Sequence, residues 1–162
     1  ERIRVAETHS AVAHCPTSNL FLGSGLFHVH QAKNLHHNMT VGLGTDIGAG
    51  TSFSILSTMN EAYKVAQLTQ YPLDSIKMLY LGTLGGAQAL GIQDKIGSLE
   101  VGKEGDVIVL DPQATDLLAF RSARVESLEE QLFVLATMGD DRTVAATYVG
   151  GELAYSRDGH SA

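Results

Sequence analysis

VGLGTDIGAG, residues 41–50, decides how the fold of this chain is interpreted. An apolar stretch leads to a carboxylate at Asp46, and Gly48 and Gly50 follow within four residues. Val41 and Leu43 are separated by glycine, a spacing typical of a strand that is buried on both faces. Glycine loses more conformational entropy on folding than other residues and adds no side-chain packing. An acid at the mouth of such a strand therefore indicates a position selected for function rather than for stability.

The sequence on both sides of this strand alternates between short apolar strands and helices. Residues 11–13 form a second expected strand, which Pro16 ends. The helices that we expect cover residues 1–8, 28–38, 53–68 and 75–90. Thr51 or Ser52 can cap the third of these helices and Asp74 the fourth, which ends at Gly91. Alternating strands and helices predict parallel α/β units.

After Gly91 the pattern changes to short β segments. Residues 95–111 contain two expected β stretches around a Gly-Lys turn, and residues 143–155 read as a hairpin with two glycines at its turn. Ser127 and Glu130 form a capping box at the start of one amphipathic helix. We therefore predict an α/β segment over 1–94, a β-rich segment with one helix over 95–155, and a disordered tail over 156–162.

Composition excludes several classes of protein. The chain has 162 residues, enough for one domain or a fragment of a larger one, and 44% of them are hydrophobic. Its 11 Lys and Arg against 18 Asp and Glu form no basic stripe, which argues against nucleic-acid binding. No apolar run is long enough for a membrane span, and residues 1–10 are not a signal peptide. A single cysteine fits a reducing compartment, so we expect a cytoplasmic protein.

The glycine-rich stretch has three interpretations. A phosphate-binding loop is the weakest of them, because the glycines miss the G-x-G-x-x-G spacing and no Walker lysine is present. Asp46 in such a loop would also repel a phosphate. Two alternatives stay open: a tight turn with a capping acid, and a metal ligand or proton carrier at the carboxyl end of a barrel strand.

Histidine and cysteine offer weaker candidates. His28 and His30 resemble a chelating pair, but residues two apart on a helix point in different directions. Adjacent His36 and His37 fail for the same reason, so we expect these four to be surface or loop residues. His14 follows a strand and is a better candidate, although a loop histidine with structural contacts remains the favoured interpretation. Cys15 lacks a neighbouring base and is interpreted as a small buried residue.

Several segments together closely resemble the guanine deaminase family of the amidohydrolase superfamily. The matching stretches are AHCPTSNLFLGSGLF (13–27), VGLGTDIGAGTSFSIL (41–56), NEAYKVAQL (60–68), GTLGGAQALG (82–91), KIGSLEVGKEGDVIVLD (95–111) and TMGDDRTVAATYVGGELAY (137–155). The strand-end acid and the return GSLEVGKEGDVIVLD are shared across the superfamily. HCPTSNLFLGSG, TDIGAGTSF, NEAYKVAQL and the late GDDR are more specific to guanine deaminases.

The resemblance implies a (β/α)8 barrel of the TIM type with a small β-sandwich built from both chain ends. This chain corresponds to its C-terminal part, namely barrel strands seven and eight with their helices and part of the sandwich. In the family one Zn²⁺ is held by four histidines and a strand-eight Asp, and it activates a water. That water attacks guanine, and the products are xanthine and ammonia. By position Asp46 is the strand-eight Asp, acting as metal ligand and proton carrier, and Ser18 and Asn19 shape the substrate pocket.

The chain also departs from the family pattern. Strands one to six are absent, and with them the zinc-binding histidines, a catalytic Glu and most guanine contacts. We therefore expect the C-terminal part of a homodimeric guanine deaminase, inactive in isolation, with guanine as its small-molecule partner. Two alternatives stay open: a related deaminase acting on another purine, a pterin or a triazine, and an inactive module that functions only in assembly.

Overall fold

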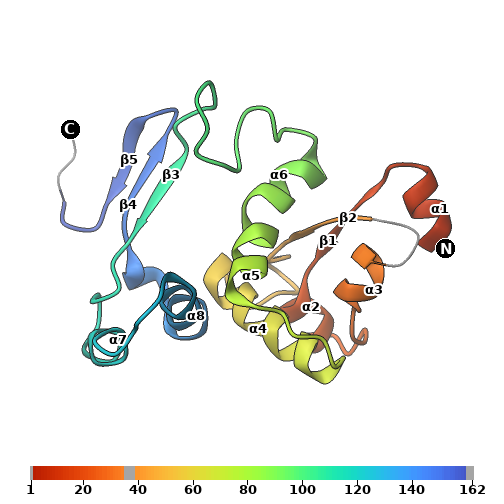
Figure 1. Ribbon diagram of the computed structural model, residues 1–162, viewed down its shortest axis with the longest axis horizontal. Coiled ribbons are helices and arrows are strands. Elements are labelled where there is room, and N and C mark those ends of the chain that lie inside the picture. The colour runs from red at the N-terminus through yellow and green to blue at the C-terminus, as the bar shows by residue number, and fades with distance from the viewer. Residues whose placement is uncertain (1, 35–38, 160–162) are drawn as a thin grey trace.

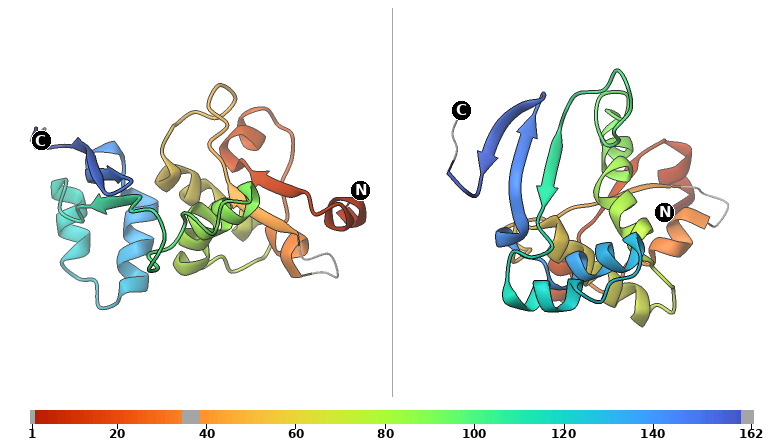
Figure 2. Two further views of the ribbon diagram at one scale, coloured as in Figure 1. Left: turned by 90° about the horizontal axis from the view of Figure 1, so that it is seen from above. Right: turned by 60° about the vertical axis from the view of Figure 1, so that its left-hand side comes forward.

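The computed structural model of the protein describes residues 2–34 and 39–159 (Figure 1). A parallel strand pair with its helices lies at one end, and an antiparallel sheet lies at the other (Figures 1 and 2). The elements are α1 (Arg2–Glu7), β1 (Ala11–His14), α2 (Pro16–Phe21), α3 (Val29–Asn34), β2 (Thr40–Leu43), α4 (Ile55–Leu68), α5 (Ser75–Gly82), α6 (Leu84–Leu90), β3 (Val107–Leu110), α7 (Asp116–Ser122), α8 (Leu128–Met138), the 3-10 turn η1 (Asp141–Thr143), β4 (Val144–Val149) and β5 (Glu152–Ser156). Within the described ranges, no helix combines the length and the apolar character needed to cross a membrane.

The two N-terminal strands pair in parallel, which confirms the expected α/β class. Ala11 lies opposite Thr40, and His14 lies opposite Leu43. Because parallel strands need a crossover between them, the chain passes through α2 and α3 before it returns as β2. The carboxyl ends of both strands consequently lie at the same edge.

Strand β2 is buried on both faces in its centre, as the sequence predicts. Val41 and Gly42 are adjacent in the strand and both buried. A Cβ atom at position 42 would lie 2.7 Å from the Cα of Gly86 in α6. Gly42 is therefore required for the close approach of helix and strand, since a side chain would force the two backbones apart.

Helix α4 begins later than its sequence suggests. The hydroxyl of Ser54 accepts a hydrogen bond from the Ser57 amide at 3.3 Å and so caps the helix, in place of the expected Thr51 or Ser52. Ser52 instead accepts a hydrogen bond from the Ser54 amide at 3.0 Å. The extra turn made by Ser52 shifts the helix start to the next available hydroxyl.

The single helix expected over 75–90 is two helices, α5 and α6. Asp74 caps α5 as predicted, accepting from the Lys77 amide at 2.8 Å, and Gly91 ends α6 in the left-handed conformation. The break falls at Thr83, whose hydroxyl donates to the carbonyl of Leu79 at 2.7 Å. Bending the chain here lets α6 lie against β2, a tertiary contact that helical periodicity does not reveal.

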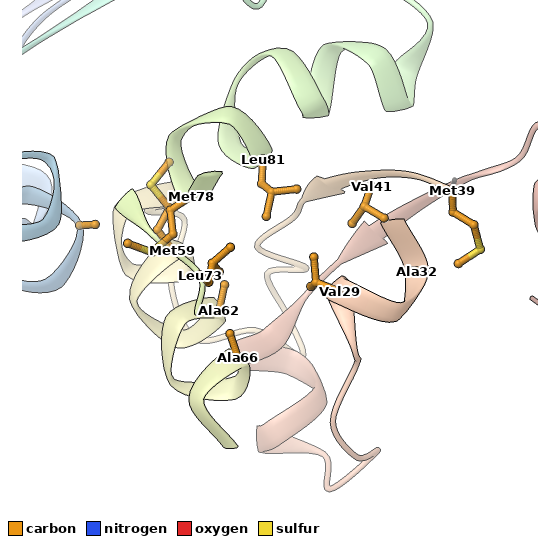
Figure 3. Close-up of a cluster of buried hydrophobic side chains, with 11 residues drawn as sticks. Val29, Ala32, Met39, Val41, Met59, Ala62, Ala66, Leu73, Met78 and Leu81 are labelled. Atoms are coloured by element: carbon orange, nitrogen blue, oxygen red, sulfur yellow. The ribbon is translucent and has the colours of Figure 1, made fainter. Parts of the chain in front are cut away.

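One apolar cluster joins the strands to the helices (Figure 3). Its members come from α3, β2, α4, α5 and α8 and from the connections before β2 and α5, so these four helices pack together around β2. The buried residues are Val29, Ala32, Met39, Val41, Met59, Ala62, Ala66, Leu73, Met78, Leu81 and Ala136. Burying a side chain of this kind stabilises a fold by about 1.5–3 kcal/mol.

The C-terminal sheet has the order β3-β4-β5 and is antiparallel throughout. Gly150 and Gly151 form its hairpin turn with φ values of 60° and 85°, which confirms the predicted hairpin. Only residues 107–110 of the stretch 95–111 form a strand. The expected first β stretch is instead a series of turns, closed by a hydrogen bond from the Glu104 amide to the Lys95 carbonyl at 2.8 Å.

Helix α8 starts at the predicted cap, but the capping box is only half formed. Ser127 accepts from the Glu130 amide at 3.2 Å, whereas the Glu130 carboxylate accepts from the Glu126 amide rather than from Ser127. The sequence predicts a single helix between residues 95 and 155, but the structure has two, because α7 precedes α8. Thr115 caps α7 by accepting from the Leu118 amide at 3.2 Å.

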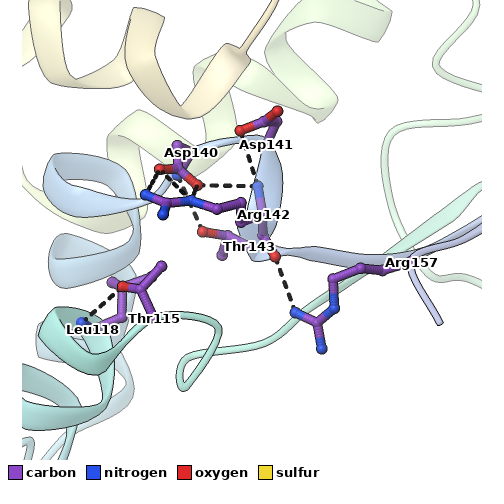
Figure 4. Close-up of polar contacts among 7 residues, drawn as sticks. All are labelled: Thr115, Leu118, Asp140, Asp141, Arg142, Thr143 and Arg157. Atoms are coloured by element: carbon purple, nitrogen blue, oxygen red, sulfur yellow. Dashed lines mark hydrogen bonds and ion pairs between the residues drawn. The ribbon is translucent and has the colours of Figure 1, made fainter.

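The GDDR segment is a joint between α8 and the sheet (Figure 4). Asp140 caps η1, and the Arg142 guanidinium beside it holds the pKa of the Asp140 carboxyl below its usual range. Arg157 donates to the Arg142 carbonyl at 3.0 Å and pairs with Asp111 at 2.9 Å. These bonds, together with Ser156 in β5, correct the expectation that disorder begins at residue 156.

Helix α8 links the sheet to the strand pair. Ser75 at the start of α5 donates to the Glu129 carbonyl at 2.8 Å, and Asn60 of α4 donates to the Thr137 carbonyl at 3.3 Å. The Tyr63 and Phe133 rings meet edge to face with centroids 5.1 Å apart. Helices α4, α5 and α8 therefore form one packed layer.

Apolar surface remains uncovered at several places in the described chain. Strands β3 and β5 are the edges of their sheet, and Ile108 of β3 is 56% exposed. An apolar cavity of about 510 Å³ lies between the sheet and α4 and α5, and Phe53 at its margin is 81% exposed. Unpaired strand edges and apolar patches favour association with other protein surface.

We expect the isolated 162-residue chain to self-associate, because association covers these edges and patches. Light scattering during size-exclusion chromatography at micromolar concentration should give a mass above the monomer. A lysine on an edge strand opposes edge pairing, so Ile108→Lys should shift the population toward monomer. Gln113→Lys adds the same charge in an exposed turn and should leave the mass unchanged. A monodisperse monomer of the parent chain would contradict this expectation.

His14 is buried beneath the helices at the end of β1. It is 1% exposed, and its ring lies 5.1 Å from that of Phe27, centroid to centroid. Neither ring nitrogen has a hydrogen-bond partner among the described residues. Burial lowers the pKa of His14 from 6.5 to about 4, so the ring is neutral at neutral pH.

This buried histidine predicts a loss of stability in acid. Because the unfolded chain takes up the proton first, the contribution is complete above pH 6.5 and is lost as the pH falls toward about 4. The difference between the two pKa values corresponds to at most roughly 3 kcal/mol. Thermal melts between about pH 7 and pH 4 span both pKa values. Over this range the melting temperature of His14→Leu should fall by less than that of the parent. An equal fall in melting temperature in the two proteins would show that His14 is not the source of the acid sensitivity.

Candidate functional site

Asp46 lies beyond the carboxyl end of β2, at the edge where β1 also ends. Asp46 lies three positions after Leu43, the last residue of the strand. The side chain is exposed. At this edge the chain turns from β1 into α2 and from β2 into the loop before α4, so the two connections meet beside the acid.

A tight turn fixes the backbone of Asp46. Its φ of 48° is in the left-handed region, which is uncommon for a residue with a side chain. The amides of Ala49 and Gly50 donate to the Asp46 carbonyl at 3.1 and 2.5 Å. A Cβ atom at position 50 would collide with the Thr45 carbonyl oxygen, so Gly50 is needed for the turn itself. The turn therefore explains the glycine at position 50, and the backbone strain of the turn lies at Asp46.

Ser18 makes the decisive contact at this site. It belongs to α2, which starts at Pro16 directly after β1, and its side chain is buried. The Ser18 hydroxyl donates to Oδ2 of Asp46 at 2.7 Å. Two candidate residues that are 28 positions apart are therefore in direct contact.

Asn19, the third candidate, follows Ser18 in α2 and is half-buried. Its amide donates to the Cys15 carbonyl at 3.0 Å, and its carbonyl accepts from the Ser24 amide at 2.8 Å. The backbone of Asn19 is thus part of the helix and of the turn that follows it. A role of its side chain in a substrate pocket stays a prediction.

Cys15 lies close to the acid without being an activated nucleophile. Burial raises the pKa of its thiol, and the negative charge of Asp46 raises it further. A raised pKa keeps the thiol protonated near neutral pH, and a protonated thiol is a poor nucleophile. This electrostatic coupling agrees with the interpretation of Cys15 as a small structural residue.

The histidine candidates lie elsewhere. His30 in α3 stacks on Tyr71, with centroids 4.6 Å apart and an interplanar angle of 22°. His28 precedes α3, and its carbonyl accepts from the Ala32 amide at 3.1 Å. His36 and His37 lie outside the described residues. The His14 ring contacts Phe27, and neither of its nitrogens bonds to Asp46 or to any other described residue.

The donor set near Asp46 is compatible with one ligand to a metal. Among residues 2–34 and 39–159, no three His, Cys, Asp or Glu side chains gather closely enough to hold an ion. Catalytic zinc sites use three protein ligands and keep one position open. Asp46 can supply one carboxylate and accept a proton, and further ligands are needed to complete such a site.

The sequence did not predict that Ser18 donates a hydrogen bond to Asp46; it predicted only that Ser18 shapes a pocket. No local spacing signals this pair, because Ser18 lies in α2 and Asp46 lies in the connection after β2. The one available signal is topological: parallel strands end at a common edge, so residues just after each strand become neighbours.

Comparison with known proteins places this geometry in a family. The Amidohydrolase family profile matches residues 1–154. The guanine deaminase of Escherichia coli (strain K12) is 52% identical over 96% of this chain and 35% of its own length. The chain thus spans about a third of that relative's length.

Solved structures agree. The E. coli guanine deaminase structure superposes with a TM-score of 0.93, covering 97% of this chain and 36% of that one. Guanine deaminase from C. acetobutylicum, solved with guanine in its active site, gives 0.80 at 28% identity over 93% of this chain and 35% of that one. An adenosine deaminase from Xanthomonas campestris with bound zinc superposes with a TM-score of 0.74 at 30% identity, covering 88% of this chain and 31% of that one. The chain belongs to the amidohydrolase family.

Proposed function

We propose that this chain is the C-terminal part of a zinc-dependent guanine deaminase, which converts guanine and water to xanthine and ammonia. The observation that carries the proposal is the 52% identity to E. coli guanine deaminase over nearly the whole chain, Asp46 region included. The preference for guanine over another purine rests on the E. coli enzyme, because its 52% identity exceeds the 30% identity to the adenosine deaminase of X. campestris. The substrate contacts that decide selectivity are expected in the part of the enzyme outside this chain.

In this proposal β1 and β2 are barrel strands seven and eight, within a barrel segment formed by residues 1–94. Residues 95–155 return to a small composite β domain, as the antiparallel sheet suggests. The parallel pairing of β1 with β2 and the helices between and after them support the assignment. Active sites of such barrels lie at the carboxyl ends of the strands, which is the edge where Asp46 lies.

Asp46 is the proposed ligand to zinc and the proposed proton carrier. Bound zinc supplies a water that ionises near neutral pH. The exposed carboxylate of Asp46 can accept the proton of that water and hold it for the departing amine. Asn19 is proposed to contribute to the pocket wall beside the acid.

Three further predictions about the whole enzyme accompany this proposal. Guanine is its small-molecule partner, the enzyme is a homodimer, and nucleic acid is not a partner. We also propose a cytoplasmic location, which the single cysteine supports because it fits a reducing compartment.

Asp46→Asn in the full-length enzyme should lower kcat by about 10²–10⁴-fold, because the amide keeps the shape but cannot accept the proton. Xanthine formation, followed by ultraviolet absorbance, measures the change. Asp94→Asn removes an exposed acid from a distant turn and should retain parental activity. Near-parental kcat for Asp46→Asn would overturn the assignment of Asp46.

The isolated 162-residue chain should release no ammonia from guanine, because the described residues offer too few metal ligands for a catalytic site. A coupled ammonia assay with added zinc measures this, with the full-length enzyme as positive control. Chelator-sensitive turnover by the pure chain would show that a complete site exists within it and would rule out the proposed division of ligands.

A further inference from the structure

The Ser18–Asp46 hydrogen bond is a built feature of the fold. The Ser18 side chain is 3% exposed, so its hydroxyl has little access to water and needs a partner in the protein. That partner is Oδ2 of Asp46 at 2.7 Å. Hydrogen bonds to a carboxylate are shorter and about twice as strong as those between neutral groups.

The two ends of Asp46 are restrained independently. Its backbone is held in the left-handed region by the Ala49 and Gly50 amides, and its carboxylate is held by Ser18. A rotating carboxylate would exchange its two oxygens. The Ser18 hydroxyl uses one lone pair of Oδ2 and fixes the orientation of the carboxylate, so Oδ1 keeps both of its lone pairs for other partners.

We propose that Ser18 is a positioning residue, whose hydroxyl holds Oδ2 of Asp46 so that Oδ1 is presented to the metal and to the proton in transit. The inference rests on the proposed function, and it changes the role of Ser18 from that of a pocket wall. Ser18 acts through Asp46, and its own side chain lies buried behind the acid.

The two roles predict different kinetics. A pocket wall contributes to substrate binding, so its loss raises KM. A residue that orients a metal ligand affects metal retention and kcat, and loss of such a partner typically lowers metal affinity or activity by about 10–100-fold. Metal retention can be measured without turnover.

The experiment uses the full-length enzyme and the variants Ser18→Ala, Ser18→Thr and Ser24→Ala. Ser24 is an exposed serine just beyond α2, so its substitution makes the same chemical change without touching Asp46. Zinc retention is measured by competition with a chelator, and kcat and KM are measured with guanine. Circular dichroism and melting temperature verify folding.

We expect Ser18→Ala to lose zinc about 10–100-fold more readily and to lower kcat by a similar factor, with KM changed by less than about threefold. Ser18→Thr keeps a hydroxyl and should recover most of both losses, and Ser24→Ala should match the parent. If Ser18→Ala fails to fold, Ser18→Cys keeps the volume but donates only weakly, and it carries the same expectation.

Two results would overturn the inference alone: parental zinc retention and kcat in Ser18→Ala, or a raised KM with parental zinc retention. A parent enzyme that binds no zinc or leaves guanine unchanged would instead overturn the proposed function, whatever the variants do. The parent and the variants therefore separate the two failures.

Discussion

The parallel pairing of β1 with β2 is the constraint on which the rest of the structure depends. It places the carboxyl ends of both strands at one edge, and it gives α3, α5 and α6 a surface on which to pack. Gly42 allows α6 to approach the strand backbone directly, so a methyl group there would separate the layers. Since the apolar cluster draws on four helices and β2, its packing also requires this register.

The same pairing creates the site at the cost of local strain. Asp46 adopts a left-handed backbone that disfavours side chains, and such conformations persist only where the surroundings determine them. Here the surroundings are the Ala49 and Gly50 amides on one side and the Ser18 hydroxyl on the other. Glycine would form this turn without strain, so the presence of an acid here indicates a chemical role.

Local signals in the sequence predicted local structure well. Asp74, Ser127 and Gly91 were identified as helix ends from residue type alone, because capping involves groups within a few positions. The break at Thr83 was missed, since it depends on the contact of α6 with β2. Helix α2 was not among the expected helices, although Pro16 fits its first turn.

The candidate site divides in the same way. Asp46 could be selected from the sequence, because an acid after a buried strand is a local pattern. Its contact with Ser18 could not, because a chain separation of 28 residues is closed only by the strand pairing. Resemblance to a family supplied residue types at matching positions but no distances, and the hydrogen bond required coordinates.

Several surfaces of the described chain are left without a protein partner. Ala11 and Ala13 expose one face of β1 while Val12 and His14 on the other face are covered, so this strand is finished on one side only. The edges of the C-terminal sheet and the cavity beside Phe53 are likewise open. The fold places a buried glycine and a strained acid at the edge shared by β1 and β2, yet one face of β1 is exposed, so further protein on that face would stabilise the strand pair.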